Sequence, residues 1–404
     1  MSEVIKIENS VDLSVSLTTT LSDETTSTGE FKVNSGVQKL VYLGKGKDET
    51  ISGTVTGLKY ELDEFGAINP IALQITENKS GKVVEIPFEL VKLCGEPEKE
   101  VESGSTITDV IANVEEGQVI NMPAESFTSE KLELSKSVSI KGAQFNVSAV
   151  SEERRNDSVE GETVIDSPVV VANDASVDLI GVAVTSKGTA INLSKAEEVS
   201  MRNVKVVNVV PTAKKTMAVL GNKDEKSVKL EVKDCYFGNA AKNEEHPEYA
   251  LYNYFELTKP LTDGSVIENC YFAAEVCSHN AINIYAVEDN ATITIKDCVF
   301  EKSVNAIRIG IIGDKRCTIN IENCTYLATD EDYPEYAGLL LIQPYGKQTT
   351  DMSHITINMK NINNKTNAKQ LWYKYAGSGD MQFDEYNVPT VIVDGRVELA
   401  PKKK

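Results

Sequence analysis

Short segments of alternating apolar and polar residues recur along the chain after about residue 99. Eight of them share an alternating run, a turn residue and a second apolar pair: SVSIKGAQF, SVDLIGVAV, EVSMRNVKV, KLEVKDCYF, SVIENCYF, TITIKDCVF, TINIENCTY and ITINMKNI. The turn residues are Gly142, Gly181, Asn203, Asp234, Asn269, Asp297, Asn323 and Asn361. A repeat every 20 to 40 residues or so is typical of a solenoid, in which each repeat contributes one coil.

A second, shorter column of apolar segments precedes several of these repeats. Its members are TAINL, MAVL, YALYNY, NAINIY, NAIRIG and AGLLLI, beginning at residues 189, 217, 249, 280, 305 and 337. Each turn of the chain therefore carries at least two short strands in a fixed order, which predicts an all-β fold, a right-handed parallel β-helix. Alternate side chains point inward, so the pairs Ile293 and Ile295, Ile319 and Ile321, and Ile355 and Ile357 are expected to form apolar ladders.

The turn position and the residue after it have their own pattern. Asn and Asp tolerate left-handed backbone geometry, and their side chains can hydrogen-bond along a stack of coils. The next position holds Cys235, Cys270, Cys298 and Cys324. One cysteine per coil forms a line and cannot surround a metal ion, so these residues are predicted to be small hydrophobic residues inside the bend.

The chain before the repeats divides into two parts by pattern. Residues 1–35 are rich in Ser and Thr, and two interpretations stay open: a docking arm or a solvated leader. Residues 36–98 contain short β-like runs such as QKLVYLG and KVVEIPFELVKL, separated by turn residues. This pattern predicts a small antiparallel barrel, loosely SH3-like or Sm-like, with an anchoring role. Residues 99–404 then form the β-helix.

Composition narrows the function classes. Lys and Arg number 41 against 61 Asp and Glu, a formal charge of −20, so binding to nucleic acid over a large surface is not expected. The start lacks a basic segment followed by an apolar one, and no long apolar run occurs, so neither a signal peptide nor a membrane span is predicted. Seven cysteines, an odd number, do not suggest a disulfide framework.

Residues 105–165 carry a more specific pattern. Ile107, Val110, Ile111 and Val114 share one face of a predicted helix that covers the open end of the coil. The strands VINMPAESF and SVSIKGA follow, and then GAQFNVSA, RRND and GETVI. This stretch resembles the opening of pectate-lyase-like β-helix domains, in a variant common among phage and bacterial surface proteins. The resemblance implies the fold but no activity, because this architecture hosts lyases, hydrolases, adhesins and inert virion proteins.

Enzymes of that superfamily use constellations that are mostly missing here. No Asp-Asp pair and no Gly-His-Gly turn occurs, and Gly310 stands where the resemblance would place a Lys after Arg308. The remaining catalytic candidates are the turn carboxylates Glu288 and Asp289, with Arg308 on the next coil as a base. No cofactor and no metal are expected.

Two long excursions, at residues 238–264 and 327–353, are candidate binding surfaces. Their tyrosines could stack on sugars, pack against another protein or pack back onto the β-helix: Tyr249, Tyr252, Tyr254, Tyr333 and Tyr336.

These features together resemble a bacteriophage virion protein. The expected function is non-enzymatic: head decoration or a head fibre, made in the host cytoplasm and carried on the virion. The partners would be the major capsid protein or other virion proteins, with surface glycans as further ligands and a homotrimer as one oligomeric state. The alternative is a carbohydrate-active or glycan-binding tailspike, in effect a polysaccharide lyase, a glycoside hydrolase or an adhesin.

Overall fold

The computed structural model divides the chain into two compact units, residues 1–96 and 97–404. It describes eight strands before residue 99, and then residues 99–403 except 225, 274–279, 302, 304, 312–314, 328–337, 344–350 and 376–384. Among the described residues, no helix has the length and apolar character needed to cross a lipid bilayer.

The first unit is antiparallel. Its main sheet has the order β7-β6-β5-β4-β8 with β1 paired to β5, and β2 and β3 form a separate hairpin. The strands are β1 (Glu3–Lys6), β2 (Leu13–Thr20), β3 (Thr26–Val33), β4 (Gln38–Gly44), β5 (Lys47–Leu62), β6 (Ile68–Glu77), β7 (Val83–Pro87) and β8 (Val91–Leu93). The division into an arm and a closed barrel stays a prediction.

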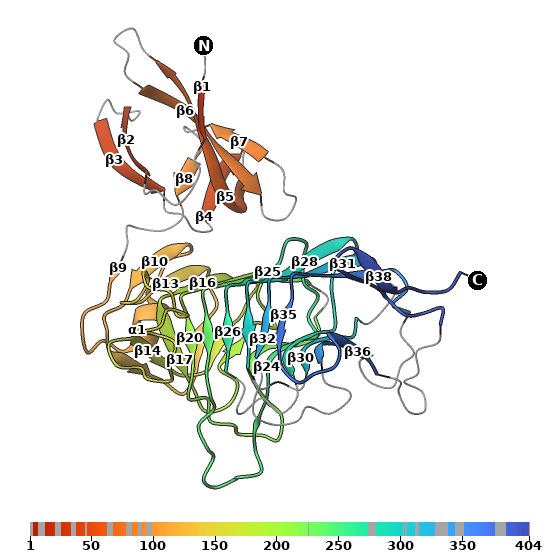
Figure 1. The fold of residues 1–404 in the computed structure, drawn as a ribbon. Coiled ribbons are helices and arrows are strands. Elements are labelled where there is room, and N and C mark those ends of the chain that lie inside the picture. The colour runs from red at the N-terminus through yellow and green to blue at the C-terminus, as the bar shows by residue number, and fades with distance from the viewer. Residues whose placement is uncertain are drawn as a thin grey trace. The chain divides into compact units, whose positions relative to one another are not determined.

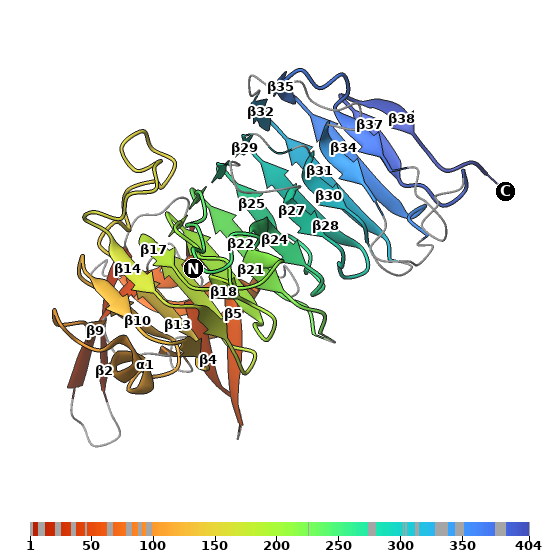
Figure 2. The same cartoon turned by 90° about the horizontal axis from the view of Figure 1, so that it is seen from below.

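The second unit is a right-handed parallel β-helix built from three sheets (Figure 1). Sheet S1 contains β9 (Lys99–Glu100), β10 (Gln118–Asn121), β13 (Val138–Lys141), β16 (Ser176–Ile180), β19 (Glu198–Arg202), β22 (Lys229–Lys233), β25 (Val266–Glu268), β28 (Ala291–Lys296), β31 (Cys317–Glu322), β34 (Ile355–Lys360), β37 (Thr390–Val393) and β38 (Arg396–Leu399). Figure 2 shows the later strands of S1 side by side, and only the last pair, β37 with β38, is antiparallel.

Sheets S2 and S3 complete each coil. S2 contains β11 (Ser126–Thr128), β14 (Thr163–Asp166), β17 (Val182–Thr185), β20 (Lys205–Val206), β23 (Tyr236–Phe237), β26 (Tyr271–Phe272), β29 (Val299–Phe300), β32 (Thr325–Leu327) and β35 (Asn363–Lys365). S3 contains β12 (Leu132–Leu134), β15 (Val169–Val171), β18 (Ile191–Asn192), β21 (Thr216–Gly221), β24 (Leu251–Leu257), β27 (Asn280–Ile284), β30 (Asn305–Ile309), β33 (Gly338–Ile342) and β36 (Trp372–Lys374). The first sequence column supplies S1 and, after its turn residue, S2; the second column supplies S3.

A short helix lies at the start of the β-helix, in the segment for which one was predicted. Helix α1 (Ile107–Ala112) buries Ile107 and Val110, and Val114 is buried just beyond it. These side chains belong to the same apolar core as the first strands of the coil. The helix therefore covers apolar surface that the first coil would otherwise leave exposed.

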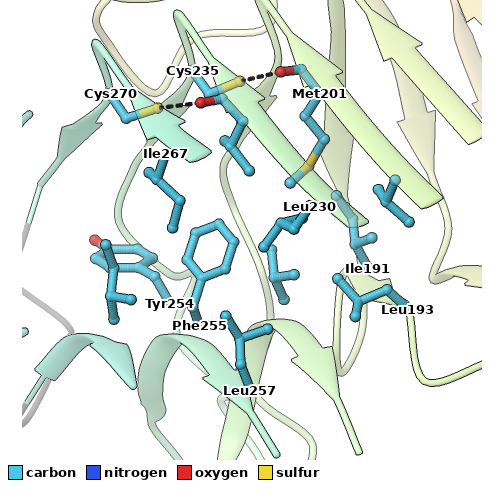
Figure 3. Packing of buried hydrophobic residues seen from close by; sticks show 14 of the residues in the cluster. Ile191, Leu193, Met201, Leu230, Cys235, Tyr254, Phe255, Leu257, Ile267 and Cys270 are labelled. Carbon is cyan, nitrogen blue, oxygen red and sulfur yellow. Dashed lines mark hydrogen bonds between the residues drawn. The ribbon is translucent and has the colours of Figure 1, made fainter. Parts of the chain in front are cut away.

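The core consists of ladders of side chains that repeat from coil to coil. Inward residues of S1 form continuous rows, and in S2 Phe272 stacks between Phe237 and Phe300 with ring centroids 5.0 and 4.9 Å apart and nearly parallel planes. Figure 3 shows residues of S1 and S3 that meet across this interior, including Leu230, Phe255 and Ile267. The side chains of each coil fill its interior and also stack on the side chains of the next coil. Each coil is therefore stabilised by its neighbours, as is general in solenoids.

The expected isoleucine ladders form. Ile293 pairs with Ile319 and Ile319 with Ile357, whereas Ile295 and Ile321 continue to Met359. Ile355 pairs with Cys317, which is also buried. All six isoleucines of the prediction are buried, so the prediction that they stack inside the coils is confirmed.

The cysteine column lies inside the bend, as predicted. Cys235, Cys270, Cys298 and Cys324 are fully buried and free. Their thiols lie near backbone carbonyl oxygens of the preceding coil, for example Cys235 Sγ at 3.5 Å from Met201 O (Figure 3). Burial raises the pKa of the Cys270 thiol well above its ordinary value. The described residues contain no group of three His, Cys, Asp or Glu side chains that could hold a metal ion.

The turn column adopts the predicted left-handed geometry. Positive φ angles occur at Gly181, Asn203, Asp234, Asn269, Asp297, Asn323 and Asn361, although not at Gly142. The amides also bond along the stack: Asn323 Nδ2 donates to Asp297 Oδ1 at 3.0 Å, and Asn361 Nδ2 donates to Asn323 Oδ1 at 3.1 Å. These bonds fix the bend between S1 and S2.

Replacing Asn323 by alanine is expected to lower the free energy of unfolding by ~1 to 2 kcal/mol, because alanine adopts the left-handed conformation at a cost and loses the amide ladder. The matched variant Asn323→Gly keeps the conformation and loses only the ladder bonds, so its loss should be smaller. Urea unfolding measures both. Equal losses in the two variants would contradict a conformational role for this residue.

Candidate functional site

The outer face of S3 carries a row of polar residues on adjacent strands. Glu256 on β24 pairs in register with Asn283 on β27, which pairs with Arg308 on β30. Asn253, three residues earlier on β24, also contacts the Glu256 side chain. These four residues form the S3 cluster, the densest polar group on that sheet among the residues with described contacts.

The Glu256 carboxyl is the centre of the S3 cluster. Its Oε2 accepts hydrogen bonds of 2.9 Å from both Asn253 Nδ2 and Asn283 Nδ2. Burial raises the pKa of Glu256, and the nearby Arg308 opposes this shift. Asn253 and Asn283 are buried, and their Oδ1 atoms have no hydrogen-bond partner. The cluster therefore offers two buried acceptors to a donor such as a hydroxyl group.

Two cations lie over aromatic rings beside the S3 cluster. The Arg308 guanidinium is 5.1 Å from the Tyr285 ring centroid, and Lys215 Nζ is 5.2 Å from that of Tyr252. Such contacts hold a cation in place at the surface of a sheet.

The predicted catalytic residues are placed in different surroundings. Glu288 accepts a hydrogen bond from the Ser227 hydroxyl. Asp289 accepts the Arg316 backbone N–H at 2.9 Å, which lowers the pKa of Asp289 below its ordinary value. Arg308 lies instead in the S3 cluster, beside Glu256. The contacts described for Glu288 and Asp289 therefore do not join them to Arg308, and their catalytic role stays a prediction.

The predicted binding tyrosines also differ from one another. Tyr249 stacks on His246 with centroids 4.5 Å apart, and Tyr252 is half-buried under Lys215. Tyr254 is fully buried, and its hydroxyl donates to backbone carbonyls of Gly238 and Ala273. Of the three interpretations that the sequence leaves open, the structure places Tyr254 in the third, because this ring packs inside the core of the β-helix. Tyr333 and Tyr336 lie outside the described residues.

The S3 cluster contains a single carboxylate. Glycoside hydrolysis generally uses two carboxyl groups about 5 to 10 Å apart, one as acid and one as base or nucleophile. The groups that shift the Glu256 pKa most are two amides and two cations, with no second acid among them. The polar groups of this arrangement are thus two amides, the Arg308 guanidinium and the Glu256 carboxyl group.

A second polar cluster lies on the outer face of S2, under the segment 142–162 that connects β13 to β14. We call this segment the strap. Buried Arg154 of the strap donates two hydrogen bonds to the Glu162 carboxylate, at 3.0 and 2.8 Å, and one to the Asn203 backbone carbonyl at 3.1 Å. Lys205 on β20 is 3.6 Å from the same carboxylate. The strap is thus held to S2 by buried charges.

The strap also accepts hydrogen bonds from uncharged groups on and beside S2. Asp157 accepts hydrogen bonds from the Tyr236 hydroxyl at 3.1 Å and from Asn239 at 3.2 Å. A Cβ at position 238 would come within 2.0 Å of Asp157 Oδ1, so the strap approaches the sheet closely only because Gly238 has no side chain. The alternating sequence pattern does not predict this contact between the strap and S2.

The outer face of S1 carries a carboxyl that responds to pH. Asp178 accepts the Ser139 hydroxyl at 2.6 Å, and burial raises its pKa to about 6. The folded chain therefore holds this proton to higher pH than the unfolded chain does. The resulting stabilisation is present below the unfolded pKa near 4 and is lost as the pH rises through about 6.

The variant Asp178→Asn is expected to match the parent chain near pH 4 and to exceed its free energy of unfolding by ~1 to 2 kcal/mol at pH 7.5, because asparagine cannot ionise. Urea unfolding at the two pH values measures this difference. The exposed residue Glu152 supplies a control, Glu152→Gln, which should show no such change. A difference for Asp178→Asn that is independent of pH would contradict the shifted pKa.

Fold and site together define this chain as a right-handed parallel β-helix protein with polar clusters on two outer faces. Protein-family models give no match to the chain, and a comparison with curated proteins gives none either.

Proposed function

We propose that this protein is a non-enzymatic structural protein of a bacteriophage particle, as head decoration or a head fibre. One observation carries the proposal: the described interior of the β-helix is filled by apolar ladders from the first strands to β37. A body of this kind is rigid without disulfides or bound metal, which suits a particle that must endure outside a cell. The resemblance of residues 105–165 to pectate-lyase-like domains of phage surface proteins supports the same class.

Residues 1–98 would anchor the protein to the major capsid protein or another virion protein. They precede a second unit that is compact by itself, so anchoring and projection are assigned to different parts of the chain. The formal charge of −20 would keep neighbouring copies apart on the particle.

Deletion of residues 1–98 tests this assignment. We expect the remaining chain to fold and to be missing from assembled particles. Circular dichroism and protease resistance report folding, and immunoblotting of purified particles reports incorporation. A full-length variant with Glu152→Gln serves as the incorporation control. Incorporation of the shortened chain at the control level would show that the anchor lies elsewhere.

The second candidate is a carbohydrate-binding or carbohydrate-cleaving protein that uses the S3 cluster. The unpartnered Oδ1 atoms of Asn253 and Asn283 favour it, because sugar hydroxyls would satisfy both. Arg308→Ala and Glu256→Gln should then weaken binding or cleavage of a surface polysaccharide, and Glu288→Gln should not. If Arg308→Ala leaves both unchanged, the S3 cluster is not the site.

A further inference from the structure

Lys205 is a buried amine with an unusual set of neighbours. Its side chain is 1 % exposed on the outer face of S2, beneath the strap. Its Nζ is 3.4 Å from Asn156 Oδ1 and 3.6 Å from Glu162 Oε1, and it also donates to the Ser158 carbonyl. An amine, a side-chain amide and a carboxylate thus meet at one point.

Burial favours a neutral amine at Lys205. Arg154 binds both oxygens of Glu162, so two buried cations share one carboxylate. A guanidinium does not release its proton under these conditions, whereas a lysine does so readily when buried. Burial lowers the pKa of Lys205, the Glu162 carboxylate opposes this shift, and Arg154 acts in the same direction as burial. The free base has the lone pair that a nucleophile needs.

The Asn156 side chain is oriented as an electrophile. Its Oδ1 accepts the Ser158 backbone N–H at 2.9 Å, a donor that would stabilise negative charge on this oxygen during attack. Its Nδ2 donates to the Glu153 carbonyl at 2.9 Å, which fixes the amide plane. Asn156 is exposed on its other side, so a small leaving group can reach solvent.

We propose that Lys205 and Asn156 join in an intramolecular isopeptide bond. The Lys205 nitrogen attacks Cγ of Asn156, and a new N–C bond forms. Glu162 accepts the proton that the attacking nitrogen loses and returns it to Nδ2. The Cγ–Nδ2 bond then breaks and Nδ2 leaves as ammonia, so no oxidant, reductant or further reactant is needed.

The bond would fasten the strap permanently to the outer face of S2. It would connect residues 49 positions apart in the sequence and close a covalent loop that contains β14 to β20. Long covalent loops constrain the unfolded chain strongly, as disulfides do. The described cysteines are all free. Because the proposed bond forms without an oxidant, this cross-link would not require an oxidising compartment, as a disulfide does.

Mass spectrometry of the purified full-length chain tests the proposal. We expect the intact mass to lie below the sequence mass by one ammonia in most molecules, and tryptic digestion to yield one branched peptide containing both residues. Asn156→Ala removes the electrophile at an exposed position, and Lys205→Arg keeps the charge without an acylable amine. Both variants should have the full mass of their sequences and release two separate peptides.

Two results would overturn the proposal. One is an intact mass equal to the full sequence mass in the folded parent chain after prolonged storage. The other is a loss of ammonia that peptide sequencing places in a cyclic imide at Asn156 and Asp157, with Lys205 in an ordinary linear peptide. The Lys205→Arg variant separates these cases, because a cyclic imide would persist in it.

Discussion

Replacing Phe272 by alanine is expected to lower the free energy of unfolding by ~3 to 5 kcal/mol. The ring is fully buried and stacked on both sides, by Phe237 and Phe300. Its loss removes apolar burial, opens a cavity that the rigid coils cannot fill, and breaks two aromatic contacts. Equilibrium unfolding in urea, followed by far-ultraviolet circular dichroism, measures the change.

Val299→Ala is the matched control. Val299 lies on the adjacent strand of the same sheet, but its side chain points to the half-buried outer face. Its loss should be ~1 kcal/mol or less. A loss of unfolding free energy for Phe272→Ala as small as that for Val299→Ala would contradict a stabilising role for the stacked phenylalanines.

The variant Glu162→Gln is expected to destabilise the protein by ~3 to 5 kcal/mol and to release the strap, because the Arg154 guanidinium stays buried without a counter-charge. Limited proteolysis should then cut within residues 142–162 before it cuts the coils. Urea unfolding gives the size of the loss.

Two controls isolate the cause of that loss. Glu160→Gln changes an exposed carboxylate in the same strap and should leave both readouts unchanged. Asn156→Ala removes the proposed covalent link but keeps the ion pair between Arg154 and Glu162. A strap that resists protease equally in Glu162→Gln and the parent chain would contradict the role of the buried carboxylate.

The repeating part of the fold could be predicted because one physical constraint is imposed on every coil. Each coil needs inward apolar residues and a tight bend, so the turn residues from Gly181 to Asn361 and the following cysteines appear as columns in the sequence. The turn residues also give the register of the strands before them. Aligning Asn323 with Asn361 places Ile357 beside Ile319 and Ile355 beside Cys317, which is the observed pairing.

The polar clusters could not be predicted because they depend on contacts between distant segments. Asn253 contacts Glu256 against the simple alternation of the strand, and Asn283 joins them only through strand register. The repeated Asn in YNYFEL, NAINIY and NAIRIG is the one sequence signal that points to the S3 cluster. The sequence left the role of Tyr254 open for a related reason: a tyrosine in a long loop segment can turn inward when a backbone carbonyl accepts a hydrogen bond from its hydroxyl.

Cryo-electron microscopy of particles from the source organism tests the proposed function most directly. The account predicts β-helix density on the head, in many copies, anchored through residues 1–98. Density at the tail tip alone would contradict head decoration and favour the polysaccharide-binding alternative. Absence of such density from the whole particle would contradict a virion role.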